Sequence, residues 1–161
     1  MDPAATLFLV RHCSAGSADR WRGDDRLRPL DARGRRQAAA LVDLVRAEGA
    51  DVQRIFSSPY LRCCQSVQPL ADALGLPAET AESLAQGTDP DTAIRMLRGL
   101  PSRDAVLCSH GDLLPELLQR LAAEAGLALG ANPARCEKGS AWVLTMAAGR
   151  CRAARYVPPR G

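Results

Sequence analysis

The sequence predicts an α/β fold, a three-layer α/β/α sandwich around a mostly parallel central sheet, in a single domain over residues 1–161. Short apolar runs alternate along the chain with longer segments whose apolar residues recur at helical spacing. This alternation is typical of parallel sheets built from successive strand and helix units. The length of 161 residues also fits one domain with a substantial core.

Three short apolar runs predict buried strands, and helix signals follow each of them. The predicted strands cover residues 6–10, 54–57 and 105–108. The first predicted helix begins after Asp31 as its N-cap and ends at Gly49, and the second begins at Ser58-Pro59 and ends at Gly75. The third begins at Asp89-Pro90. The fourth carries an apolar stripe through Leu117, Leu118 and Leu121 and ends at Gly126.

The carboxy-terminal part of the chain has a different pattern. Residues 142–146 and 152–157 flank Ala148-Gly149, which predicts an antiparallel hairpin that closes the sheet. The stretch from Leu129 to Pro133 is expected to be a long connection rather than a boundary between domains.

Composition excludes several classes of protein. No apolar run approaches the roughly 18 residues that a membrane-spanning helix needs, and the amino-terminal segment lacks the basic region and cleavage site of a signal peptide, so we expect a cytoplasmic protein without a membrane partner. The net charge of +3 and an aromatic content of 4% leave little for nucleic-acid binding.

The cysteines and histidines give no sign of a metal site. The six cysteines are scattered and contain no CxxC pair, and the chain has two histidines in all, so we expect buried thiols, no zinc and no other metal or cofactor. The clustered carboxylates that a Mg²⁺ ion prefers are also missing from the sequence pattern.

The candidate chemistry lies at the ends of the three predicted strands. His12 follows the first strand and His110 follows the third, and these are the two histidines of the chain. In an open α/β sheet, ligands bind outside the carboxyl ends of the strands, so we expect both imidazoles to face one crevice. Arg11 precedes His12, and Arg62 lies in the first turn of the helix after the second strand, near a helix amino terminus that favours anions.

These four side chains suit the transfer of a phosphoryl group. Guanidinium groups can bond bidentately to phosphoryl oxygens. One neutral imidazole can attack phosphorus to form a phosphohistidine, and the other can stabilise the charge on the transferring group.

The segments LVRHCSAG, SSPYLR and CSHGD resemble the histidine phosphatase superfamily, which has the phosphoglycerate mutase-like fold. Cys13 stands where the usual Arg-His-Gly signature has glycine, and this variation is similar to the short SixA-type phosphohistidine phosphatase branch. The Arg28-Pro29-Leu30 and Lys138-Gly139-Ser140 stretches also resemble the phosphatase domain that follows a Nudix domain in certain bacterial nucleotide-sanitising enzymes.

The resemblance implies that His12 is the nucleophile and that Arg11, Arg62, His12 and His110 form the phosphate pocket. It leaves the proton donor open, because Gln86 falls where many relatives have a glutamate and an amide cannot protonate a leaving group. Glu82 and Asp112 are the two candidates for that catalytic role. Weak acid catalysis favours substrates with good leaving groups, such as a phosphoramidate or a diphosphate.

Three functions are consistent with the sequence. The first is a phosphatase that removes phosphate from a phosphohistidine protein or a nucleotide through a covalent intermediate on His12. The others are a phosphomutase and a pseudoenzyme that binds phosphate as an interaction module. The intact histidines and arginines weigh against the pseudoenzyme, and the short chain weighs against the mutase. The expected partner is the phosphorylated substrate, and the oligomeric state is left open.

The loop from residue 14 to residue 28 is expected to form a wall of the site. Its four arginines, at positions 20, 22, 26 and 28, predict a positive rim that attracts acidic or polyanionic partners. Trp21 in this loop either stacks on a substrate ring or packs against its own loop, and the second is the commoner behaviour of a surface aromatic residue.

Overall fold

The computed structural model describes residues 4–161, so the expected single domain over residues 1–161 extends three residues beyond the described part. It contains a six-stranded sheet in the order β3-β2-β4-β1-β5-β6. The strands are β1 (Ala5–Arg11), β2 (Arg54–Ser57), β3 (Ala78–Thr80), β4 (Ala105–Ser109), β5 (Ala141–Ala147) and β6 (Arg150–Val157). Strands β1 to β4 pair in parallel, and β5 pairs antiparallel with both β1 and β6.

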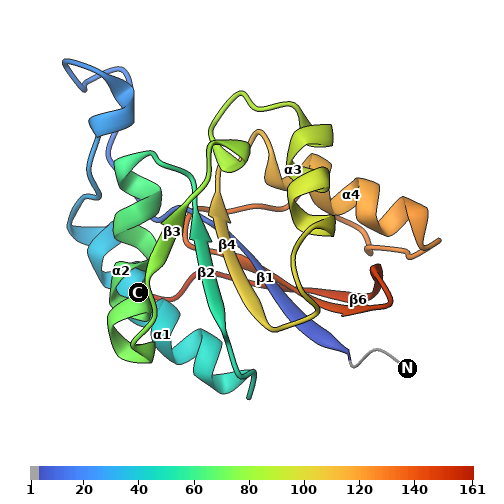
Figure 1. Cartoon of the computed structure of the whole chain (residues 1–161). Coiled ribbons are helices and arrows are strands. Elements are labelled where there is room, and N and C mark those ends of the chain that lie inside the picture. Colours follow the sequence, from blue (N-terminus) through green and yellow to red (C-terminus); the bar gives the residue numbers. More distant parts are fainter. Residues whose placement is uncertain (1–3) are drawn as a thin grey trace.

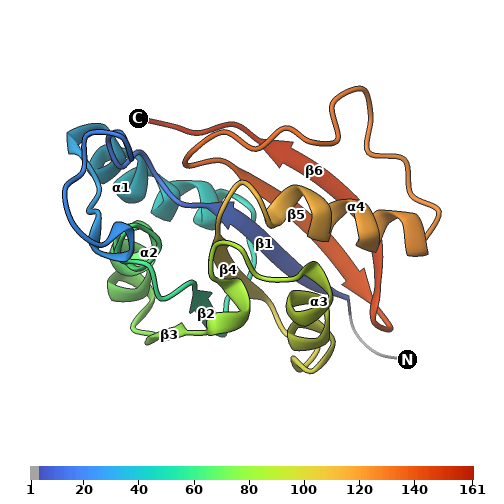
Figure 2. The same ribbon diagram turned by 90° about the horizontal axis from the view of Figure 1, so that it is seen from above.

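Helices cover both faces of this sheet, which confirms the three-layer α/β/α fold (Figures 1 and 2). Helices α1 (Ala32–Ala47) and α2 (Leu61–Leu74) lie on one face, and α3 (Pro90–Arg98) and α4 (Leu114–Glu124) lie on the other. Two short 3₁₀ helices, η1 (Asp25–Leu27) and η2 (Glu82–Leu84), lie in the connections. None of the helices within residues 4–161 is long and apolar enough to cross a bilayer.

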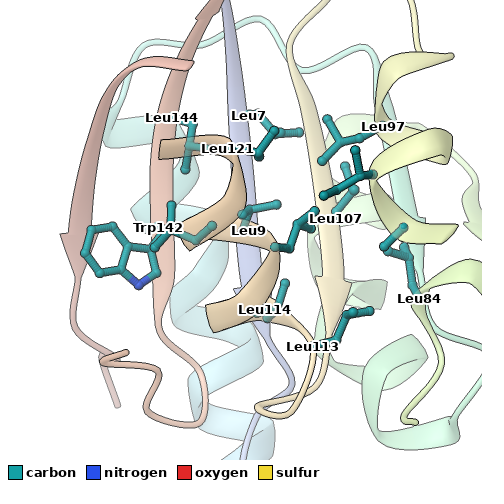
Figure 3. Packing of buried hydrophobic residues seen from close by; sticks show 14 of the residues in the cluster. Leu7, Leu9, Leu84, Leu97, Leu107, Leu113, Leu114, Leu121, Trp142 and Leu144 are labelled. Carbon is teal, nitrogen blue, oxygen red and sulfur yellow. The ribbon is translucent and has the colours of Figure 1, made fainter. Parts of the chain in front are cut away.

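The alternation of side chains along β1 explains the two cores. Leu7 and Leu9 point toward α3 and α4, whereas Phe8 and Val10 point toward α1 and α2. Figure 3 shows the first core, in which the leucines of α4 pack on Leu9 and Leu107 in the middle of the sheet. A strand buried on both faces reads as a continuous apolar run, which is why these strands are visible in the sequence.

Most of the predicted element boundaries are confirmed. The Asp31 side chain accepts a hydrogen bond from the Gly34 N–H and caps α1, and the Asp89 side chain caps α3 in the same way. Gly75 ends α2 in a left-handed conformation with φ 66°. The β5–β6 hairpin forms around Ala148-Gly149, and four of the six cysteines are buried, all six thiols being free.

One expectation about the region after β2 is wrong, and one strand in this region was not predicted. The helix does not begin at Ser58-Pro59, because both residues lie outside it and α2 starts at Leu61 with Tyr60 as its N-cap. The Ser58 hydroxyl is used instead in the site described below. Strand β3 was not predicted, and it has only three residues, which are half-buried or exposed and give no apolar run.

Candidate active site

The sheet topology brings the carboxyl ends of β1, β4 and β2 to one place. Arg11 at the end of β1 is in register with Ser109 at the end of β4. The chain leaves β1 toward α1 on one face and leaves β4 toward α4 on the other, so a crevice opens between the two strands. His12 and His110 follow these strands, and their ring centroids are 5.4 Å apart.

This crevice is a cavity of about 290 Å³. Its wall contains the four residues predicted to hold phosphate, together with Asp112. The lining residues are Arg11, His12, Gly16, Ala18, Arg28, Arg62, Gln86, His110, Gly111, Asp112 and Lys138.

Glu82 does not line the cavity. Its carboxylate pairs with Arg26 at 2.8 Å, and 74% of its side chain is exposed. Asp112 does line it, and one of its carboxylate oxygens accepts a 2.8 Å hydrogen bond from the Gly87 N–H. The structure therefore places one of the two candidate proton donors at the cavity and the other on the surface.

His12 is held in the state that a nucleophile requires. Its Nδ1 lies 2.8 Å from the Cys13 carbonyl oxygen, and since a carbonyl can only accept, Nδ1 carries the hydrogen and Nε2 keeps its lone pair. Burial, together with the charges of His110, Arg62 and Arg11, lowers the pKa of His12 from 6.5 to about 3. The imidazole is therefore neutral at physiological pH.

His110 is oriented by Ser58, which lies in the connection between β2 and α2. Its Nε2 lies 2.9 Å from the Ser58 hydroxyl, which also accepts a 3.2 Å hydrogen bond from the Tyr60 N–H. Ser58 can give its own hydrogen to Nε2, and His110 then carries its hydrogen on Nδ1. The Tyr60 ring packs against the imidazole edge-on, with centroids 4.7 Å apart.

Arg62 is 1% exposed and is fixed by two neighbours from distant parts of the chain. Its guanidinium donates to the backbone oxygen of Asp25 at 2.9 Å, to the Asp25 carboxylate at 3.1 Å, and to the Gln86 side-chain oxygen at 2.6 Å. The guanidinium is thus positioned before any ligand binds. Gln86, which occupies the position expected for an acid, acts here as an acceptor for Arg62.

Arg11 reaches the cavity because Gly111, which packs against its guanidinium, has no side chain. Its guanidinium donates to the Cys136 carbonyl oxygen at 2.7 Å. A Cβ atom on Gly111 would lie 2.8 Å from the Arg11 Cζ, which is closer than real side chains approach. Glycine at position 111 therefore leaves room for this guanidinium.

The turn after His12 is fixed by side chains of α1 and α2. The Cys13 N–H donates to the Ser66 hydroxyl at 2.8 Å, and the Ser14 N–H donates to the Gln37 side-chain oxygen at 2.9 Å. Asp31 accepts from the Ser14 hydroxyl and from the Gly16 N–H at 2.7 and 3.0 Å. The carbonyl that orients His12 is therefore held on a rigid segment.

The sequence did not assign Asp25, Ser58 or Lys138 to the site. Asp25 accepts from both Arg28 and Arg62, and hydrogen bonding to Arg28 is the main cause that lowers its pKa. Arg28 was expected on a solvated rim, but it is buried and donates to the Ala15 carbonyl oxygen at 2.6 Å. No signal in the sequence pairs Asp25 with an arginine 37 residues away.

Several polar atoms in this region are buried without a partner. They are the Nε atoms of Arg11 and Arg62 and the Nδ1 of His110, none of which has a hydrogen-bond partner within residues 4–161. Buried donors are nearly always satisfied in folded proteins. The three residues that carry these atoms all line the cavity, where an anion with several acceptor oxygens would meet their N–H groups.

The comparison with family models agrees with this geometry. The model of the histidine phosphatase superfamily (branch 1) matches residues 7–86, which include Arg11, His12 and Arg62. The chain belongs to the histidine phosphatase superfamily.

Two curated relatives are similar in sequence. The 8-oxo-(d)GTP phosphatase of Mycolicibacterium smegmatis is 36% identical over 161 residues, covering 96% of this chain and 48% of that protein. The phosphohistidine phosphatase SixA of Escherichia coli is 29% identical over 82 residues, covering 51% of this chain and 48% of that protein. The chain thus matches about half the length of each relative.

Solved structures of two phosphatases share the fold. The protein histidine phosphatase SixA in complex with tungstate has a TM-score of 0.76 at 21% identity, covering 96% of this chain and 95% of that one. A mycobacterial glucosyl-3-phosphoglycerate phosphatase has a TM-score of 0.68 at 18% identity, covering 96% and 97%. This likeness extends the superfamily fold over the described chain, beyond the stretch that the family model matches.

Proposed function

We propose that this chain is a phosphatase that transfers a phosphoryl group to the Nε2 of His12 and then to water. The observation that carries the proposal is the state of His12. Its Nδ1 is committed to the Cys13 carbonyl, its ring is neutral, and its free Nε2 belongs to a cavity lined by Arg11 and Arg62.

The proposed reaction has two steps. In the first, the Nε2 lone pair attacks phosphorus, and the bond to the leaving group breaks with its electron pair going to the leaving group. In the second, water attacks phosphorus, the P–N bond breaks, and inorganic phosphate leaves with His12 neutral again. Arg11, Arg62 and His110, which line the cavity, offer N–H donors for the charge on the transferring oxygens.

Asp112 is proposed to move the proton in both steps. It is the one carboxylate on the cavity lining within residues 4–161, whereas Gln86 on the same lining cannot release a proton. The names of the two curated relatives point to two substrate classes, nucleotides and phosphohistidine proteins. Both present a terminal phosphoryl group on a larger body, and the proposed substrate belongs to one of these two classes.

The test is detection of the covalent intermediate. Acid-labile phosphate should appear on the protein when hydrolysis of ³²P-labelled substrate is quenched with base, and H12A should carry none. Hydrolysis of p-nitrophenyl phosphate by the wild-type protein separates an enzyme from a phosphate-binding module. Label that persists in H12A would show that His12 is not the nucleophile.

A further inference from the structure

A second cavity, of about 230 Å³, lies beside the active-site cavity within the loop that joins β1 to α1. This loop projects beyond α1 and α2 (Figure 1, blue). Its cavity is lined by Ala15, Gly16, Ser17, Arg20, Trp21, Arg28, Pro29, Leu30 and Asp31. Gly16 and Arg28 line both cavities, so the two are adjacent and share a border.

Trp21 is the most unusual residue on this second cavity. Within residues 4–161 only Trp21 and Leu27 are large hydrophobic residues that are exposed, and Trp21 is 37% exposed. Its indole Nε1 donates to the Asp24 carbonyl oxygen at 3.0 Å, so the ring is held in one orientation. The contact with its own loop satisfies the indole N–H, yet more than a third of the residue is left accessible.

Hydrogen bonds hold the loop that carries Trp21 in a fixed conformation. Arg28 is buried, and its guanidinium donates one hydrogen bond to the Asp25 carboxylate at 2.9 Å and another to the Ala15 carbonyl oxygen at 2.6 Å. Asp31 holds the Gly16 N–H from the helix side. A cavity whose walls are ordered before binding loses little freedom when a ligand binds.

The linings of the two cavities carry more positive than negative side chains. The cations are Arg11, Arg20, Arg28, Arg62 and Lys138, against the carboxylates of Asp31 and Asp112, and Arg28 on the shared border is paired with Asp25. Burial and the neighbouring arginines lower the pKa of Lys138. A ligand that crosses this border would carry anionic groups on the His12 side and an apolar ring on the Trp21 side.

We propose that the cavity beside Trp21 binds the base of a nucleotide whose terminal phosphate reaches His12. An aromatic base can stack on the fixed indole, since every base has a planar π face. The phosphates between base and terminal group then pass Arg28 and Lys138. The inference rests on the proposed function and selects nucleotides over phosphohistidine proteins as the substrate class.

Matched substrates and variants test this subsite. GTP and tripolyphosphate carry the same anhydride chemistry with and without a base. W21A should raise the KM for GTP by about 10-fold or more with kcat within about twofold, in keeping with the loss of one base-stacking contact. The same variant should hydrolyse tripolyphosphate as the wild type does, and W21F should restore most of the GTP affinity.

Leu27 provides the matched control, because it is the other exposed large hydrophobic residue and lies in the same loop. L27A should leave the KM for both substrates unchanged, and melting temperatures should show that all variants are folded. Equal loss on GTP and tripolyphosphate in W21A, or no loss on GTP, would overturn the base subsite. Loss confined to a phosphohistidine peptide would overturn it in favour of a protein partner.

Binding without turnover keeps the two proposals separate. GDP should quench the tryptophan fluorescence of H12A, a variant that cannot form the intermediate, and W21F should abolish that quenching because Trp142 is buried in the core. If no phosphoenzyme forms but GDP binds at Trp21, the proposed function fails and the base subsite stands. If the phosphoenzyme forms and GDP binding does not depend on Trp21, the subsite fails and the function stands.

Discussion

Replacement of Arg62 by alanine tests the phosphate pocket most directly. The side chain is 1% exposed, and three of its N–H groups are already committed to Asp25 and Gln86. Arg62 also lines the cavity, and the guanidinium N–H groups that are not committed to Asp25 or Gln86 are the donors assigned to a phosphoryl oxygen. Loss of one preorganised donor to the transition state costs about 3 kcal/mol, so R62A should lower kcat/KM by about 10²-fold.

Two further variants separate the parts of that loss. R62K keeps the positive charge but loses the planar fork that spans Asp25 and Gln86, so its activity should fall between wild type and R62A. D25N weakens the support for the guanidinium without removing it, and a loss smaller than that of R62K is expected. Steady-state rates with a substrate that has a good leaving group give these values.

A control outside the site guards against a general loss of stability. Arg120 pairs with Asp91 on the surface, where ion pairs contribute about 0–1 kcal/mol. R120A should therefore keep full activity and nearly the wild-type melting temperature. Folded R62A with less than a tenfold loss in kcat/KM would refute the assignment of Arg62 to the phosphoryl group.

Three other perturbations have expected outcomes. Burial lowers the pKa of His12 from 6.5 to about 3, so between these pH values the unfolded chain binds a proton that the folded chain does not, and the free energy of unfolding should fall as the pH drops from 6.5 toward 3. Urea unfolding should show that this free energy depends less on pH in H12N than in wild type, and an equal pH dependence in the two proteins would contradict the buried neutral state. D112N should lose more activity on alkyl phosphates than on p-nitrophenyl phosphate while E82Q matches wild type on both, and a loss in D112N that is the same for every leaving group would remove Asp112 as the donor. G111A should lower kcat/KM about tenfold or more with little change in melting temperature, because the new Cβ displaces the flexible guanidinium of Arg11, and unchanged kinetics would show that this guanidinium tolerates the shift.

The sequence predicted the fold wherever a local signal and a buried position coincide. Strand β4 is an unbroken apolar run, and the N-cap residues Asp31 and Asp89 fix where two helices begin. The start of α2 was misjudged because Ser58-Pro59 has the composition of a helix start. The Ser58 hydroxyl is instead used by His110, a contact made 52 residues away in the sequence.

The placement of Arg11, His12, Arg62 and His110 in one crevice could also be predicted from the sequence, because each lies at or shortly after the end of a strand and parallel strands end at one edge of the sheet. What surrounds these four residues could not. Asp25, Ser58 and Gln86 act through single hydrogen bonds between segments far apart in the chain. Such bonds have no periodicity or spacing that a sequence pattern can reveal.

The sequence by itself determined the three layers of the fold, the positions of its buried strands along the chain and the residue types of the proposed phosphate pocket. Only the tertiary structure decided between Asp112 and Glu82 as a residue at the cavity, and only it set the charge state of His12. The physical reason is that burial of a strand or helix produces a local sequence pattern, in which apolar residues recur with a period of two or 3.6 residues. The pKa of His12 and the positions of the Asp112 and Glu82 side chains depend instead on burial and on neighbours from distant parts of the sequence, which only the folded chain brings together.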